Sequence, residues 1–248
     1  MKNNTISHKK LLTSVLLTLF KFCIFTFLYN TSAGQNDTLK IRKEIAFGGI
    51  LLSHSVVNLL LPSTHFICNT VDCGKTWKQN QFDNKGPEIL FKNRALASDF
   101  TALGTMMAAS LLTLSIKKEK RLEYMIVGAQ NVWLTANITQ TIKLLSARNR
   151  PYTQANGFVF TKNDDHQGFL SGHSSVTAAV ASTAILLALH EPSIPKWAKS
   201  SALAAGVLAL TTASLRVASG KHYPTDVVGG ILVGVGVALI NNKLHETF

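Results

Sequence analysis

The positions of apolar and polar residues divide most of the chain into six apolar stretches rich in small side chains. No alternation of the kind typical of β-strands is sustained, and Gly and Pro cluster between the stretches rather than within most of them. This pattern predicts an all-α helical bundle with five or six helices after an N-terminal segment. The stretches are Ile45–Leu61, Leu96–Ile116, Leu122–Leu145, Ser174–His190, Ser200–Ala218 and Asp226–Asn241.

Whether these helices cross a membrane is a separate question. A membrane span needs about 20 mainly apolar residues, and several of the stretches are shorter or contain polar side chains. The third stretch contains Gln130, Asn131, Asn137 and Gln140. Both a membrane-embedded bundle and the interior helices of a soluble bundle therefore remain open, with the membrane as the expected partner of the first.

The N-terminal segment has the pattern of an export signal. A basic, polar start is followed by an apolar run from Leu11 to Leu28 and by small residues up to Gly34, although Lys21 interrupts the run. We expect a signal peptide, or an uncleaved anchor, over residues 1–34. An N-terminal helix with a polar exported loop over 35–95 and a helical core over 96–243 complete the expected organisation.

Charge and cysteine content narrow the possible partners. The formal net charge of +12 indicates an anionic partner, such as a phosphate ester or an acidic lipid. Nucleic acid is not expected, because the cations are scattered and form no basic helix interleaved with aromatic residues. Cys68 and Cys73 lie close together in a polar stretch, where a small-loop disulfide or two unpaired thiols are the alternatives.

A basic turn suggests how the helices would be oriented in a membrane. Four cations between Lys117 and Arg121 are typical of a cytoplasmic loop. Counting helices from that turn places Lys143–Pro151, Ser171–His173 and Arg216–His222 together on the exported face. The sequence does not predict an oligomeric state.

These three segments contain the groups that phosphate chemistry requires, namely three cations, two histidines, a serine hydroxyl, a glycine backbone and a carboxylate. Such a set can bind, attack and release a phosphoryl group without a metal, so we expect a phosphatase with no cofactor. Lys143 and Arg150 lie two helical turns apart, so one helix end can direct both cations to one site. Pro151 is expected to end that helix, because the residue before a proline disfavours the α conformation.

The other two segments supply the reacting groups. Ser171 is predicted to cap a helix whose first amides point at an anion, and Gly172 lets the backbone approach it closely. His173 would then protonate the leaving oxygen. We expect His222 to be the nucleophile, with one imidazole nitrogen fixed by a hydrogen bond to Asp226. The alternative for this pair is a structural role.

The three motifs resemble those of the type 2 phosphatidic acid phosphatase family, which shares its helical core with vanadium-dependent haloperoxidases. The family pattern is K-x6-R-P, P-S-G-H and S-R-x5-H-x3-D. The chain matches it over about residues 96–241, with Leu170 in place of the family proline and one residue inserted between Ser214 and Arg216. The resemblance implies phosphate binding by Lys143, Arg150, Ser171, Gly172 and Arg216, with His173 as the acid, His222 as the nucleophile and Asp226 as its partner.

The function expected from this resemblance is metal-independent hydrolysis of a lipid phosphate or diphosphate, in a bacterial inner membrane with the active site facing the periplasm. A soluble periplasmic acid phosphatase acting on small phosphate esters, a vanadate-dependent haloperoxidase and a protein with a vestigial site are the alternatives. A solvated loop is expected for Asp164–His166, and packing for Tyr152 and Tyr223.

Overall fold

The computed structural model describes residues 49, 81–83, 89–160 and 163–245. The expected signal segment, the expected helix at Ile45–Leu61 apart from Gly49, and the Cys68/Cys73 pair lie outside the described residues. Internal contacts divide the chain into two units, residues 1–69 and residues 70–248. All of the helices named below belong to the second unit.

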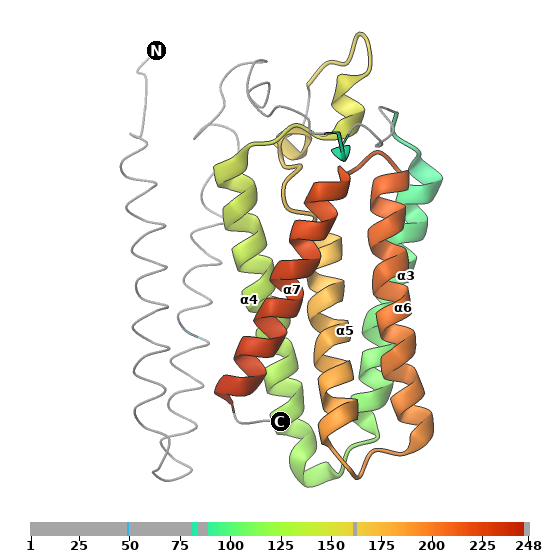
Figure 1. Cartoon of the computed structure of the whole chain (residues 1–248), viewed down its shortest axis with the longest axis vertical. Coiled ribbons are helices and arrows are strands. Elements are labelled where there is room, and N and C mark those ends of the chain that lie inside the picture. The colour runs from blue at the N-terminus through green and yellow to red at the C-terminus, as the bar shows by residue number, and fades with distance from the viewer. Residues whose placement is uncertain (1–48, 50–80, 84–88, 161–162, 246–248) are drawn as a thin grey trace. The chain divides into compact units, whose positions relative to one another are not determined.

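Within the described residues, the second unit is built from long α-helices, and the expectation of an all-α fold is confirmed (Figure 1). Two short 3-10 helices, Pro151–Gln154 and Asn163–His166, lie in the connection between the second and third of the long helices. The long helices are α3 (Lys92–Leu114), α4 (Lys118–Ser146), α5 (Gly172–His190), α6 (Lys196–Ala218) and α7 (Pro224–Leu244).

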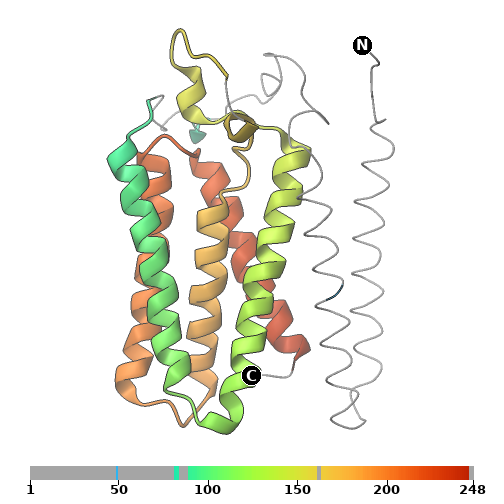
Figure 2. The same ribbon diagram turned by 180° about the vertical axis from the view of Figure 1, so that it is seen from behind.

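Helix α5 lies at the centre of this bundle. It packs against α3, α4, α6 and α7, while α3 also packs along α6 and α4 along α7. Helices α3 and α4 contact each other little, and α5 is visible between them from behind (Figure 2). The central helix begins with the Ser-Gly-His segment, so this packing places that segment among the ends of its neighbours.

The distribution of side-chain size across the bundle is that of a membrane protein. Small residues such as Ala179, Ala198, Ala205 and Ala238 are fully buried, whereas large apolar side chains on α3, α6 and α7 point outward. Small residues allow close helix approach in lipid, where large apolar groups gain nothing by turning inward. Helices α3, α5, α6 and α7 are long and apolar enough to cross a membrane, and we describe the chain as a membrane protein.

Helix α4 is more polar, and its polar residues face the interior of the bundle. The amide of Asn131 donates to Thr183 Oγ1 on α5 at 2.8 Å and to Asn242 Oδ1 on α7 at 3.1 Å. Asn241 donates to Asn131 Oδ1 at 2.9 Å. Polar side chains join helices in this way where no water is available, which accounts for the polar interruptions of the third apolar stretch.

Two glycines of α7 allow it to lie directly against α5. A Cβ atom added to Gly230 would lie 2.7 Å from the carbonyl oxygen of Ser171, and one added to Gly234 would overlap the Ser175 carbonyl and lie 2.8 Å from the amide nitrogen of Ala179. Any larger residue would therefore push the two backbones apart. This contact fixes the start of α5 against the start of α7, where two of the three motifs lie.

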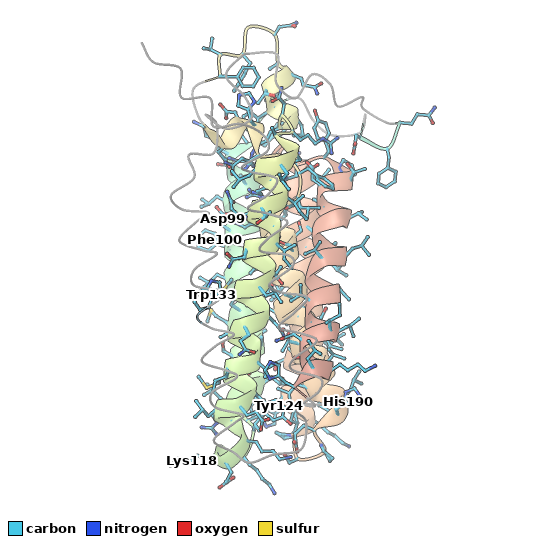
Figure 3. The ribbon with its side chains drawn as sticks, turned by 90° about the vertical axis from the view of Figure 1, so that its left-hand side faces the viewer. Asp99, Phe100, Lys118, Tyr124, Trp133 and His190 are labelled. Carbon is cyan, nitrogen blue, oxygen red and sulfur yellow. The ribbon has the colours of Figure 1, made fainter. Side chains whose placement is uncertain are left out.

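The two ends of the bundle differ as the sequence predicts. At one end Lys117 precedes α4, and the other three cations of the expected basic turn lie in the first turn of that helix. All three motif segments lie at the other end. Figure 3 shows Lys118, Tyr124 and His190 toward the first end and Asp99 toward the second.

Candidate active site

The first motif differs locally from the expected helix end. Helix α4 ends at Ser146, with Ala147 in the left-handed conformation at φ 44°, and Pro151 starts a 3-10 helix instead of ending α4. The backbone between them is held by the neighbouring loop, since Gly168 N donates to Arg148 O at 2.7 Å and Arg150 N donates to Asp165 O at 3.0 Å. Lys143 is therefore presented by a helix and Arg150 by a loop.

Arg150 is buried and held in place by the loop before α5. Its Nε donates to the carbonyl oxygen of Asp164 at 2.8 Å and its Nη2 to the Asp164 carboxylate at 2.5 Å. Its Nη1 lies 3.5 Å from Nε2 of His222. The loop containing Asp164, Asp165 and His166 is thus not simply solvated as expected, because Asp165 also accepts from the hydroxyl of buried Tyr152 at 2.7 Å.

Arg216 reaches the site from the last turn of α6. Its Nη1 donates to Ser98 Oγ at 3.1 Å and to Asp99 Oδ1 at 3.3 Å, both on α3. Its Nε is buried and has no hydrogen-bond partner among the described residues. The Nε atom of Arg121 is in the same situation, so this feature alone does not mark an anion site.

The start of α5 has the predicted cap. Ser171 is the N-cap, and its Oγ accepts from the amide of Ser174 and lies 2.9 Å from the Ser174 hydroxyl. The amides of Gly172 and His173 fall in the first turn, where helical amides have no intrahelical partner. The Nζ of Lys143 lies 3.7 Å from the position of a Cβ on Gly172, so this cation and the helix start share one space.

The two nitrogens of His222 have different surroundings, and these define its tautomer. Nδ1 lies 2.8 Å from the carbonyl oxygen of Gly168, which only accepts, so Nδ1 is the N–H donor. Nε2 faces the guanidinium of Arg150, which only donates, so Nε2 has the free lone pair. The nitrogen that faces Arg150 is therefore the one with the free lone pair.

Burial and charge keep this imidazole neutral. The side chain of His222 is 1% exposed. Burial lowers the pKa of His222 well below its ordinary value, and the positive charges of Arg150, Lys143 and Arg216 lower that pKa further. Of these three cations, Arg150 lies within contact distance, with Nη1 3.5 Å from Nε2 of His222.

Asp226 does not make the hydrogen bond expected of it. Its Oδ2 lies 3.5 Å from His222 Nδ1, beyond the 2.8 Å contact that Nδ1 makes with Gly168, and accepts from the amide of Tyr223 at 2.8 Å. Its Oδ1 accepts from Arg148 Nη1 at 2.5 Å. Asp226 thus caps α7 and binds Arg148. Its negative charge lies near His222, and it holds the start of α7, which follows His222 in the chain.

His173 is half-buried at the edge of the site and contacts a residue that sequence reasoning missed. Its Nε2 lies 2.9 Å from Oδ1 of Asp99. Asp99 stands in the apolar stretch that forms α3, and it is the only acidic residue of that helix. An isolated acidic residue in a span-like helix is the signal that could have identified it.

Arg148 is the second residue that was missed. It is buried within the first motif, and its Nη2 donates to Asp83 Oδ2 at 2.7 Å while its Nη1 binds Asp226. Asp83 also accepts from the hydroxyl of Thr225 at 2.8 Å. Arg148 therefore ties the polar insert before α3 to the start of α7, as a support behind the motif residues.

An open cleft leads from this cluster along the bundle. It has a volume of about 490 Å³, and its polar end is formed by Asp99, Lys143, Gly172 and His173. Its apolar part lies between α3 and α4 over α5, and it shares Met106 and Ala136 with a second, mostly apolar cavity of about 680 Å³. The charged site is thus open toward an apolar groove between helices.

Of the comparisons with known proteins, the one with protein families agrees with the motifs. No curated protein is significantly similar in sequence. The chain is similar to a transmembrane PAP2-type phosphatidylglycerolphosphate phosphatase from Bacillus subtilis, whose crystal structure matches with 19% identity and a TM-score of 0.43 over 93% of this chain and 96% of that one. The model of the PAP2 superfamily matches residues 124–248, half of the chain and all three motifs. The chain belongs to the PAP2 superfamily.

Proposed function

We propose that this protein is a phosphatase that hydrolyses a lipid phosphate or diphosphate through a phosphohistidine intermediate. The observation that supports this most directly is the position of the cation cluster. Arg150 Nη1 lies 3.5 Å from the buried Nε2 of His222, and the positive charges of Lys143 and Arg216 also act on this imidazole. Lys143 in addition lines the cleft that runs from the start of α5 between α3 and α4 toward apolar side chains. A lipid phosphate has the matching distribution of charge and apolar surface.

The phosphate group would lie among the three cations. Arg150 and Arg216 offer planar sets of donors, and Lys143 and the first amides of α5 complete the charge around the equatorial oxygens. The Arg216 Nε that has no partner among the described residues would gain one. Because the side chains already balance the charge of the phosphate, the reaction as proposed needs no metal.

In the first step, Nε2 of His222 attacks phosphorus as the bond to the leaving oxygen breaks. Gly168 accepts the Nδ1–H throughout and so keeps the attacking nitrogen unprotonated. His173 transfers a proton to the leaving oxygen, so the lipid departs as an alcohol or, from a diphosphate, as a monophosphate.

In the second step, neutral His173 removes a proton from a water molecule, which attacks the phosphorus of phosphohistidine. The P–N bond breaks, inorganic phosphate leaves, and both histidines return to their starting states. The negative charge of Asp226 lies near His222 in both steps and favours the positive charge that the imidazole acquires.

The site would face the exterior of the cell. The basic turn at Lys117–Arg121 lies at the opposite end of the bundle, and basic loops are retained in the cytoplasm. Trypsin added to intact spheroplasts should leave this turn uncut and should cut it after permeabilisation. Cleavage in intact spheroplasts would contradict the orientation.

The main test is phosphate release by the purified protein in detergent with EDTA. Long-chain lipid phosphates would be compared with small soluble esters, using wild type and Ala136→Phe, which places a large ring where the two cavities meet. We expect metal-independent release from lipids, and a loss of about tenfold or more in kcat/KM for lipids alone in the variant.

Ala204→Phe is the matched control, because Ala204 is exposed on α6 and the same ring there leaves the cleft open. Equal losses on lipid and soluble esters in Ala136→Phe would indicate a distorted site instead of a blocked cleft. No release from any ester by a folded protein in EDTA would contradict the proposed function.

A further inference from the structure

Asp99 occupies an unusual position for an acidic residue. It lies on α3, whose neighbouring outward residues Leu96, Phe100 and Leu103 are large and apolar, and its side chain is 53% exposed. A carboxylate in such a helix is costly unless it is paired or functional. Figure 3 shows Asp99 toward the end of the bundle where the site lies.

Among the described residues, the Asp99 carboxylate has polar contacts with two groups of the site. Its Oδ1 lies 2.9 Å from His173 Nε2 and 3.3 Å from Arg216 Nη1. Arg216 is also held by Ser98, so it does not depend on Asp99 for its position. His173 is 40% exposed, and within the described residues its ring has no other hydrogen-bonding side chain.

This contact decides which nitrogen of His173 can react. A carboxylate only accepts hydrogen bonds, so Nε2 of His173 carries the N–H that donates to Asp99. Nδ1 is then left to face the leaving oxygen. Without Asp99 the half-exposed ring would rotate and exchange tautomers freely.

We infer that Asp99 is a positioning residue for the general acid, holding His173 by Nε2 so that Nδ1 carries the proton to the leaving group. This rests on the proposed function and adds a residue from α3 to the reaction. The proton on Nδ1 moves to the leaving oxygen as the P–O bond breaks, while the proton on Nε2 stays on the nitrogen and is donated to Asp99. In the second step Nδ1 takes a proton from water, which restores the starting state.

The inference makes a prediction about leaving groups that a structural role does not make. Benzyl phosphate and 4-nitrophenyl phosphate are similar in size, but benzyl alkoxide needs a proton to leave and nitrophenolate does not. In Asp99→Asn we expect kcat/KM for benzyl phosphate to fall by about 10²-fold, and kcat/KM for 4-nitrophenyl phosphate to change little. We compare kcat/KM because it does not include the hydrolysis of phosphohistidine, a step in which His173 acts equally for both esters.

A double-mutant cycle connects this effect to His173. In a His173→Asn background the general acid is already lost, so adding Asp99→Asn should reduce benzyl phosphate hydrolysis no further. Glu119→Gln is the matched control, since it replaces an exposed carboxylate by an amide at the opposite end of the bundle and should leave both esters unaffected.

Other outcomes would overturn the inference. Equal losses on both esters, or a loss that persists in the His173→Asn background, would mean that Asp99 supports the fold or the phosphate site. A lower KM with unchanged kcat would mean that it competes with phosphate for Arg216. If wild type hydrolyses neither benzyl phosphate, 4-nitrophenyl phosphate nor a lipid phosphate, the proposed function itself fails.

Discussion

Both ends of the bundle contain buried polar side chains, but the hydrogen bonds and charge pairing of these side chains differ between the two ends. At the end with the basic turn, Glu191 caps α5 and accepts from Ser193 Oγ at 2.7 Å, Lys120 Nζ at 3.0 Å and Tyr124 OH at 3.2 Å. These hydrogen bonds, that of Ser193 first, lower the pKa of Glu191 to about 2. The charge of this carboxylate is balanced entirely within the chain.

At the motif end, the positive charges of the side chains are not all paired within the described part of the chain. Arg148 is bound by Asp83 and Asp226, but Lys143 forms no ion pair within the described part of the chain. The difference indicates that one end is built for stability and the other for an anion from outside, since buried charges require a counter-charge.

The largest effect is expected from removing the nucleophile at the motif end. His222→Asn should lower kcat by about 10⁴-fold or more, because it removes the imidazole nitrogen that is proposed to attack phosphorus. Rapid-quench labelling with ³²P-substrate should trap an acid-labile, base-stable phosphoenzyme in wild type and none in the variant. A labelled phosphoenzyme in His222→Asn would exclude this residue as the nucleophile.

Removing one of the motif cations should give the next largest effect and change the pH profile. Lys143→Met is expected to lower kcat/KM by about 10²-fold. Because Lys143 helps to lower the pKa of His222, its removal should raise that pKa. Activity requires the neutral imidazole, so the acid limb of kcat/KM should move to higher pH.

Lys143→Arg is the control for this pH effect, because it keeps the positive charge. Its acid limb should stay near that of wild type on the same substrate, whatever its absolute rate. An acid limb that does not move in Lys143→Met would show that the charge of Lys143 does not act on His222.

The close contact of α5 and α7 should matter to both stability and activity. Gly234→Ala brings a Cβ against the backbone of α5 and should lower the free energy of unfolding by about 1–3 kcal/mol, with a severalfold loss of activity as Ser171–His173 is displaced. Gly236 lies two residues further on, with nothing within 4 Å of its added Cβ. Gly236→Ala should therefore be neutral or slightly stabilising, and equal Tm values for the two variants would refute this account.

The smallest effect on activity is expected at the other end. Glu191→Gln should reduce the free energy of unfolding by about 1–2 kcal/mol without changing kcat/KM. The pKa of Glu191 is lowered on folding, so its ionised form contributes stability above its ordinary pKa, and this contribution is lost as the pH falls toward 2. The Tm of wild type in detergent should fall over this range more steeply than that of the variant, while a loss of activity would couple the two ends.

Local signals in the sequence predicted much of the fold. Apolar stretches separated by polar residues gave the helices with bounds displaced by a few residues, because helix formation and burial follow from such patterns. The N-cap at Ser171 is a short-range preference and is present as predicted. The basic turn and the motifs lie at opposite ends because helix length alone places them there.

The errors were at positions where several segments meet. Pro151 was expected to end α4, but loop contacts at Arg148 and Arg150 end the helix earlier. Asp226 was expected to hold His222, but the Gly168 carbonyl lies closer to Nδ1. Residue types do not indicate which backbone carbonyl a side chain will contact, since every residue has one. A loop conformation in turn depends on partners that are distant along the chain.

The sequence by itself determined helices α3 to α7 and the family, and it predicted the phosphate-binding and reacting side chains. The tertiary structure decided which nitrogen of His222 is free, that Arg148 supports Asp226, and that Asp99 reaches His173 from another helix. Asp99 and Arg216 meet across 117 positions of sequence. Composition and spacing specify local conformation, whereas hydrogen bonds between such distant residues exist only once the helices have packed.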